Sequence, residues 1–342
     1  MKHLRRKRPT DRFVQGLQFA AARVAASALT SLDVETALRG ARATGRLVHR
    51  FDHRHRLRVM RQLALALPEW PHARREAACQ RAFEHCLQIV VEMCFTPRLV
   101  HRDSWSGRAV FGDLSPLLRT LNAGKPAVLV TGHVGNWEVL GFIMAVLGYS
   151  MHALYRPLDN PFLNQWLVSV RQQRGLQLVS KWKAADRMKD VLAEGGSLGF
   201  IADQDAGERG IFVPFFGHLA STYKSVGLLA TSHQVPVLCG WARRRGSGFG
   251  FELVLEDAIY PSDWERQPDP LYYVTARFMR AIESMVRKAP DQYIWFQRRW
   301  RSRPRFERRG ESMPDRLRQQ LESLPWMDQA TMNRLEEPMI DT

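Results

Sequence analysis

From about residue 125 onward, short apolar runs alternate with longer stretches of helical periodicity. Runs rich in β-branched and aromatic residues predict buried strands, and apolar residues recurring every three or four positions predict helices. The predicted strands cover 127–131, 152–155, 176–179, 198–202, 236–241 and 251–255, and the predicted helices cover 136–147, 160–174, 184–194, 221–233 and 270–288. This alternation predicts an α/β fold with a central mixed β-sheet flanked by helices.

The first third of the chain carries helical patterns instead. The clearest predicted helix covers 75–97, where Phe83, Leu87, Val91 and other apolar residues recur at helical spacing. The charged segment after Arg301 predicts an extension that is partly helical or mobile. We therefore predict a helical N-terminal region over 1–110, an α/β domain over 111–305 and a peripheral C-terminal extension over 306–342.

The charge balance of the chain points to an anionic partner. Lys and Arg number 50 against 34 Asp and Glu, which gives a formal net charge of +16 in 342 residues. Nucleic acid, an anionic lipid surface and an acidic protein all satisfy this balance. The sequence contains no helix-turn-helix, zinc-finger or RNA-recognition pattern, so nucleic acid is the least favoured partner.

The first 29 residues offer a place for a membrane contact. A basic run over 1–8 precedes an amphipathic pattern over 13–29, which Gln15, Gln18 and Arg23 interrupt. One interpretation is a helix lying in the interface of an anionic membrane surface. The other is a helix packed on the domain behind a solvated tail. No run of 18 apolar residues is present, so no transmembrane helix is expected.

The cysteines and histidines show no metal-binding pattern. The four cysteines, at positions 79, 86, 94 and 239, include no pair separated by two residues. Buried, reduced thiols are the simplest interpretation. We therefore expect no metal and no cofactor.

Residues 130–139 carry the strongest candidate for chemistry. His133 falls on a predicted turn from a buried strand to a helix, and Glu138 lies in the first turns of that helix. A carboxylate there can orient the imidazole, and the imidazole can take a proton from a hydroxyl. An acid five residues after a histidine occurs about once by chance in such a chain. The placement therefore matters more than the spacing, and a structural histidine at a helix start is the alternative.

Several ordered segments together resemble the bacterial lipid A biosynthesis acyltransferase family, the lauroyl/myristoyl-type enzymes of the lysophospholipid acyltransferase-like superfamily. The resemblance covers about residues 45–305. It rests on HVGNWE at 133–138, YRPLDNP at 155–161, ADQD at 202–205, GIFVPFFG at 210–217, QYIW at 292–295 and RRWR at 298–301.

The resemblance implies transfer of a fatty acyl group from a thioester to a hydroxyl of a glycolipid such as a lipid A precursor. The donor would be an acyl carrier protein or acyl-CoA, and the site would lie at the cytoplasmic face of the inner membrane. His133 would be the general base and Glu138 its orienting partner. The implied substrate-binding residues are Asn136, Arg156, Asp203, Phe215, Gly217 and Arg298.

These assignments have structural alternatives. Arg156 is also suited to a surface ion pair, Asp203 to a strand-end cap, Phe215 to the core and Arg298 to a solvated face. The sequence departs from the family in two places: the N-terminal helix is weakly apolar, and Phe296-Gln297 stands where the family commonly has a histidine. Both departures leave a different lipid acceptor, such as a lysophospholipid or another glycolipid, open.

Overall fold

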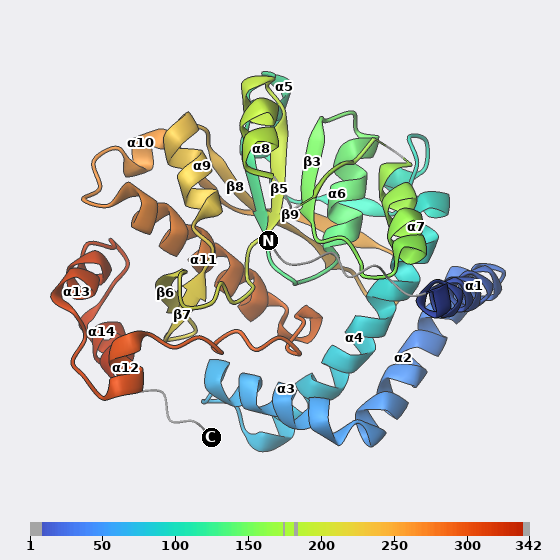
Figure 1. The fold of residues 1–342 in the computed structure, drawn as a ribbon, viewed down its shortest axis with the longest axis horizontal. Coiled ribbons are helices and arrows are strands. Elements are labelled where there is room, and N and C mark those ends of the chain that lie inside the picture. The colour runs from blue at the N-terminus through green and yellow to red at the C-terminus, as the bar shows by residue number, and fades with distance from the viewer. Residues whose placement is uncertain (1–8, 174, 181–183, 338–342) are drawn as a thin grey trace.

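A seven-stranded sheet forms the centre of the computed structural model, which describes residues 9–173, 175–180 and 184–337 (Figure 1). The basic run over 1–8 lies outside the described residues. Across the sheet the strands are β1 (Ala109–Phe111), β9 (Phe251–Ile259), β8 (Val237–Arg244), β2 (Val128–Thr131), β5 (Ser197–Ile201), β3 (Met151–Tyr155) and β4 (Gln177–Ser180). β8 and β9 are antiparallel, and all other neighbours are parallel. The expected α/β fold with a central mixed sheet is confirmed.

Helices cover both faces of this sheet, because successive apolar strand residues point to opposite sides and both sides have to be buried. In β2, Val128 and Val130 join one core cluster and Leu129 packs against the other. Helices on the first side include α8 (Ala184–Ala193), α9 (Ser225–His233) and α11 (Pro270–Lys288), and α3 (His53–Ala66) joins the same core cluster; those on the second include α5 (Ser115–Asn122) and α6 (Trp137–Val146).

A hairpin over residues 211–222 was not predicted. Its strands are β6 (Ile211–Phe215) and β7 (His218–Thr222), joined by Phe216 and Gly217. Both linking residues have positive φ, 51° and 73°, as in a type I′ turn. The expected start of a helix at 221 was wrong: residues up to Thr222 already pair in β7, and α9 begins at Ser225.

Helices α1 (Pro9–Thr30), α2 (Val34–Phe51) and α4 (His72–Leu99) lie at one side of the molecule, at the right of Figure 1. α1 packs on α7 (Pro161–Gln172): the ring centroid of Phe19 lies 6.1 Å from that of Phe162, and Asn160 Nδ2 donates to the Gln15 carbonyl at 3.0 Å. Away from this contact, Phe13 is 70% exposed and Val24 69% exposed. α1 is therefore packed on the domain and still presents apolar side chains to its surroundings.

None of the helices within the described residues has both the length and the apolarity needed to cross a membrane.

Residues 304–337 pack at the opposite side, at the left of Figure 1. The remaining short elements of the chain are η1 (Trp105–Gly107), α10 (Pro261–Trp264), η2 (Pro290–Gln292), α12 (Arg305–Arg309), α13 (Asp315–Glu322) and α14 (Gln329–Glu336). Leu321, Met332 and Leu335 are buried in the same cluster as residues of β6 and α11. The segment expected to be peripheral thus supplies core side chains.

Replacing Leu321 with alanine should destabilise the protein, because this fully buried side chain would leave a cavity between α13 and the rest of the core. We expect the free energy of unfolding to fall by about 2–5 kcal/mol, measured by denaturant titration. Gln319→Ala, on the exposed side of the same helix, is the control and should change it by less than about 0.5 kcal/mol. Equal effects of the two substitutions would contradict a core role for α13.

Candidate active site

His133 lies on the turn between β2 and α6, at the carboxyl edge of the sheet. The turn is held by residues 292–295, here called the clamping segment. Ile294 N–H donates to the His133 carbonyl at 2.9 Å, and Val134 forms a β-bridge to Tyr293. Ligands of open α/β sheets characteristically bind at this edge.

Gly135 gives this turn its shape. Its φ is +62°, a conformation that residues with a Cβ rarely adopt, and its N–H donates to the Gln292 carbonyl at 2.8 Å. A Cβ at this position would lie 2.1 Å from the Ala242 carbonyl oxygen. The close approach of β8 therefore requires glycine here.

The hydrogen-bond partner of the His133 ring is Asp203, which follows β5. Asp203 Oδ1 lies 2.6 Å from His133 Nδ1, and Asp203 Oδ2 accepts from the His133 backbone N–H at 2.9 Å. Asp203 is fully buried, whereas the His133 side chain is 17% exposed. A carboxylate at Nδ1 selects the tautomer in which Nδ1 carries the proton and Nε2 is free to accept one.

His133 and Asp203 shift each other's pKa. Burial lowers the pKa of His133, but the charge and hydrogen bond of Asp203, together with the charge of Glu138, raise it above its ordinary value of 6.5. Burial raises the pKa of Asp203, yet His133 outweighs it and lowers this pKa from 3.8 to about 2. Asp203 is therefore ionised near neutral pH, and His133 stays protonated to a higher pH than a free imidazole.

Gln297 holds Asp203 from the other side. Its Nε2 donates to Asp203 Oδ2 at 2.9 Å and to the Tyr293 hydroxyl at 2.6 Å. Sequence reasoning noted Gln297 only as a departure from the family pattern and gave it no role. Its place between QYIW at 292–295 and RRWR at 298–301, at the position where the family commonly has a histidine, was the available signal.

Glu138 has partners other than the one expected. Its carboxylate accepts from Arg171 Nε at 2.8 Å, from Nη2 of the same guanidinium and from Trp137 Nε1 at 3.1 Å. The Trp137 ring in turn packs edge-on against the His133 ring, with centroids 4.9 Å apart. Glu138 thus lies close enough to raise the pKa of His133, while the hydrogen bond at Nδ1 belongs to Asp203.

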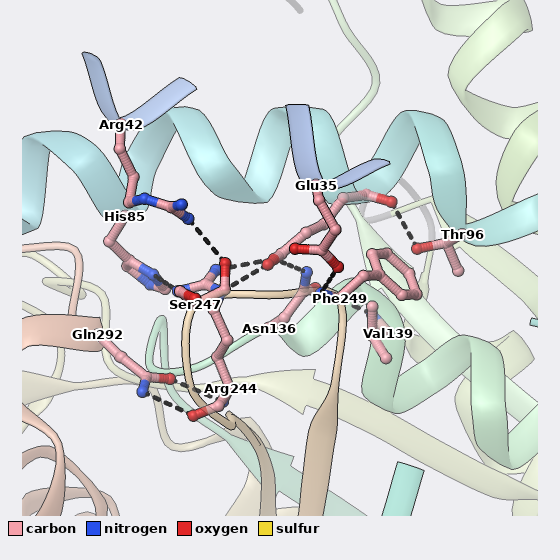
Figure 2. Close-up of polar contacts among 11 residues, drawn as sticks. Glu35, Arg42, His85, Thr96, Asn136, Val139, Arg244, Ser247, Phe249 and Gln292 are labelled. Carbon is pink, nitrogen blue, oxygen red and sulfur yellow. Dashed lines mark hydrogen bonds and ion pairs between the residues drawn. The ribbon is translucent and has the colours of Figure 1, made fainter. Parts of the chain in front are cut away.

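Asn136, expected to bind substrate, is fully buried and caps α6 (Figure 2). Its Oδ1 accepts from the Val139 N–H at 3.0 Å, and its Nδ2 donates to Glu92 Oε2 at 2.6 Å. Both polar ends of its side chain are therefore used inside the protein, where they support the His133 turn.

Glu92 and Arg244 form a buried ion pair beneath this cap. Arg244 bonds both carboxylate oxygens of Glu92 and donates to His85 Nδ1 at 2.9 Å. Burial and the charge of Arg244 lower the pKa of His85, so His85 is a neutral acceptor. Gln292 extends the network by accepting from the Arg244 backbone N–H at 2.8 Å (Figure 2). Sequence reasoning missed this network, which joins distant segments of the chain.

The two arginines predicted to bind substrate, Arg156 and Arg298, are both exposed, whereas the neighbouring Arg299 is buried. Arg156 follows β3, which pairs with the β5 strand that leads to Asp203, and its side chain is exposed; Arg298 is exposed as well. Arg299 is 2% exposed and donates to the Ser221 carbonyl and the Thr222 hydroxyl, both at 2.6 Å. The basic segment after Phe296 is therefore partly core and partly surface.

Phe215 and Gly217 lie in the β6–β7 hairpin. Phe215 is fully buried against Phe216 and Trp300, and a Cβ on Gly217 would lie 2.8 Å from Arg334 of α14. Their neighbours are thus core side chains and the C-terminal helix.

An apolar cavity, here called the inner cavity, lies between the sheet and α6. The charged and hydroxyl-bearing residues of its wall gather at the carboxyl edge of the sheet, beside Trp137: Thr131, Glu138, Tyr155 and Arg171. The rest of the wall is apolar and reaches Leu117, Met144 and Met151, toward the amino ends of the strands. The cavity begins next to the His133 turn and suits an unbranched hydrocarbon chain.

Among the described residues, His, Cys, Asp and Glu side chains do not gather in threes as metal ligands. The four cysteines are free, and burial raises the pKa of each thiol.

Comparison with known proteins identifies the family to which this chain belongs. The model of the family described as bacterial lipid A biosynthesis acyltransferase matches residues 17–302, which include the His133 turn, Asp203 and the clamping segment. The protein belongs to this family. The lipid A acyltransferases are O-acyltransferases, and the chain is an enzyme of this type.

The relatives agree with this assignment. The chain is 25% identical over 266 residues to a lipid A biosynthesis acyltransferase of Haemophilus influenzae, covering 76% of this chain and 81% of the relative. It is 26% identical over 269 residues to the lipid A biosynthesis lauroyltransferase of Escherichia coli, covering 76% and 83%. The lipid A biosynthesis palmitoleoyltransferase of Escherichia coli is 28% identical over 195 residues, 56% of this chain and 61% of the relative.

Removing the charge of Asp203 should lower the pKa of His133. In Asp203→Asn the raising effect of the carboxylate is lost, while burial still lowers the pKa. We expect histidine NMR titration to place the pKa of His133 above 6.5 in the wild type and lower in the variant. If neutral His133 is the base, the acid limb of kcat/KM should move to lower pH along with it.

His218 lies in the β6–β7 hairpin and is the internal control, so its titration should be alike in both proteins. An unchanged His133 titration in Asp203→Asn would contradict the assigned pair.

Proposed function

We propose that this acyltransferase moves a fatty acyl group from an acyl thioester to a hydroxyl group of a glycolipid such as a lipid A precursor. The observation that carries the proposal is His133 itself, bonded at Nδ1 by a buried carboxylate and placed beside an apolar cavity. The family and the names of the relatives support the lipid acceptor.

His133 Nε2 accepts the proton of the acceptor hydroxyl as the hydroxyl oxygen attacks the thioester carbonyl. The imidazolium formed is stabilised by Asp203, which stays ionised because its pKa is about 2. When the tetrahedral intermediate collapses, the carbon–sulfur bond breaks and the imidazolium gives its proton to the thiolate. The products are an ester and a free thiol, and His133 ends neutral as it began.

Glu138 supports this step through its charge. Its carboxylate raises the pKa of His133 and so favours the imidazolium that forms during transfer. Its hydrogen bond from Trp137 also holds the indole ring against His133. We therefore assign orientation of the imidazole chiefly to Asp203 and electrostatic support to Glu138.

The inner cavity takes the acyl chain of the donor. Its polar end lies beside the His133 turn, where the reacting carbonyl must be, and its apolar walls run away from that point. Each buried methylene group contributes about 0.8 kcal/mol, so a long chain gains much of its affinity here. Arg156 and Arg298, both exposed, are suited to phosphate or to the developing oxyanion.

An acyl carrier protein is the donor that best fits the charge of the chain. Such a carrier is acidic, and the chain has a formal charge of +16, so electrostatic attraction would speed their encounter. Acyl-CoA supplies the same thioester and remains the alternative.

We further propose that the enzyme works at the cytoplasmic face of the inner membrane through α1. Phe13, Leu17 and Val24 are 70%, 56% and 69% exposed along this helix. The basic run over 1–8 precedes them in the sequence, which suits an anionic membrane surface.

Replacing His133 with alanine should lower acyl transfer by about 100-fold or more, because the general base is lost. The measurement is steady-state transfer to a lipid A precursor by the purified full chain, with the product detected by mass spectrometry. Circular dichroism should show an unchanged fold. A folded His133→Ala enzyme with near-normal turnover would disprove the mechanism.

Glu138→Gln completes this comparison, because it keeps the size of the side chain and removes its charge. Turnover should fall with little change in the apparent affinity for the donor, since the charge acts mainly in the transition state. Full activity in Glu138→Gln would restrict the catalytic group to His133 and Asp203.

Placing charges on the exposed face of α1 should weaken membrane binding. Phe13→Glu combined with Val24→Glu is expected to lower the affinity for vesicles containing anionic phospholipid at least about tenfold, measured by co-sedimentation. Arg12→Glu changes the net charge by the same amount without removing apolar surface, and should have the smaller effect. Equal binding by the wild type and the Phe13/Val24 variant would exclude α1 as the membrane contact.

A further inference from the structure

A second hollow, here called the outer groove, lies between α1, α4 and α7. Its walls include Ala26 of α1, Met93 of α4, and Leu163, Trp166 and Val170 of α7. Phe19 of α1 packs edge-on against the Trp166 ring, with centroids 6.5 Å apart, so the two helices are joined along the groove. The groove is built largely from apolar side chains, and one of its walls is the helix with the exposed apolar face.

Arg171 joins the outer groove to the reaction centre. Among the described residues, it alone lines both the outer groove and the inner cavity. Its guanidinium bonds Glu138, and the neighbouring Trp137 packs against His133. Arg171 therefore forms part of the wall of both hollows, and Glu138 and Trp137 connect it to the proposed base.

Transfer of an acyl group between lipids brings two sets of hydrocarbon chains to one centre. The donor carries a single chain that ends at the reacting carbonyl, which suits the inner cavity. A glycolipid acceptor keeps its own chains and stays in the membrane, so its chains need a groove beside an element that reaches the membrane. We propose, on the basis of the acyl transfer proposed above, that the outer groove binds an acyl chain of the acceptor lipid.

Charged groups at the groove suit the head of such a lipid. The Arg23 guanidinium lies over the Trp166 ring, 5.5 Å from its centroid, and its side chain is exposed. Arg171 provides a second guanidinium at the inner end, next to Glu138. A guanidinium binds phosphate by paired hydrogen bonds, and because those of Arg171 are already made to Glu138, Arg23 is the group suited to an anionic glycolipid head whose chain covers Trp166 and Val170.

Filling the groove should weaken binding of the acceptor and leave binding of the donor unchanged. In Val170→Trp the new indole occupies the groove, whereas Ser169→Trp adds the same indole to the exposed side of α7. Each full-length variant is assayed with an acyl thioester donor and either an acylated lipid A precursor or its O-deacylated form. We expect Val170→Trp to raise the KM for the acylated acceptor about tenfold or more, with the KM for the donor and transfer to the deacylated form as in the wild type.

Ser169→Trp should behave like the wild type with both acceptors. A rise in the donor KM of Val170→Trp, or an unchanged KM for the acylated acceptor, would overturn the assignment of the groove. Either result leaves the proposed reaction in place as long as the wild type transfers acyl groups and His133→Ala does not. If instead the wild type and His133→Ala transferred acyl groups equally well, the proposed function itself would be contradicted.

Photocrosslinking of the wild-type chain gives a second test that does not depend on a folded variant. An acceptor glycolipid with a diazirine in its acyl chain should label peptides containing Met93 and the 161–172 helix. An acyl thioester with a diazirine in its chain should label peptides containing Met144 and Met151 of the inner cavity. The reverse pattern, or labelling of the inner cavity by both probes, would overturn the proposal.

Discussion

The buried ion pair between Glu92 and Arg244 is the interaction on which the site depends. Removing two charges from water costs several kcal/mol for each ion, so such a pair is stable only when its remaining hydrogen bonds are satisfied. Here Glu92 accepts from Asn136, Arg244 donates to His85, and the Arg244 backbone is bonded by Gln292. The pair therefore joins α4, β8, the start of α6 and the clamping segment at one buried point. Once these are joined, the turn that carries His133 has little freedom to move.

The two carboxylates near His133, those of Asp203 and Glu138, have different effects on its imidazole. Asp203 is fully buried and close enough to bond both Nδ1 and the backbone of His133, so it determines the orientation and tautomer of the ring. Glu138 is paired with the Arg171 guanidinium, and this positive charge reduces the effect of the Glu138 carboxylate on the imidazole. A carboxylate compensated in this way still favours the imidazolium, but less strongly than Asp203 does.

Local sequence patterns predicted most of the elements that the structure contains, but not which of them are neighbours. The turn at His133 was predictable because a β-branched strand, two glycines and a helix start all lie within one short segment. Asp203 was singled out only by family resemblance and given another role, since its contact with His133 depends on β2 and β5 being adjacent, which periodicity does not encode. The hairpin was missed because Pro214 interrupts its first strand and Phe216 occupies a left-handed turn position usually filled by Asn or Gly.

The position of α1 links its exposed apolar face to the outer groove. The same helix packs on α7 through Phe19 and the Gln15 carbonyl, forms one wall of the outer groove and exposes Phe13 and Val24. Because one helix does both, a tilt of α1 at the proposed membrane surface would change the width of the groove. Under the proposed function, the surface that holds the lipid substrate would therefore also set how well the enzyme receives it.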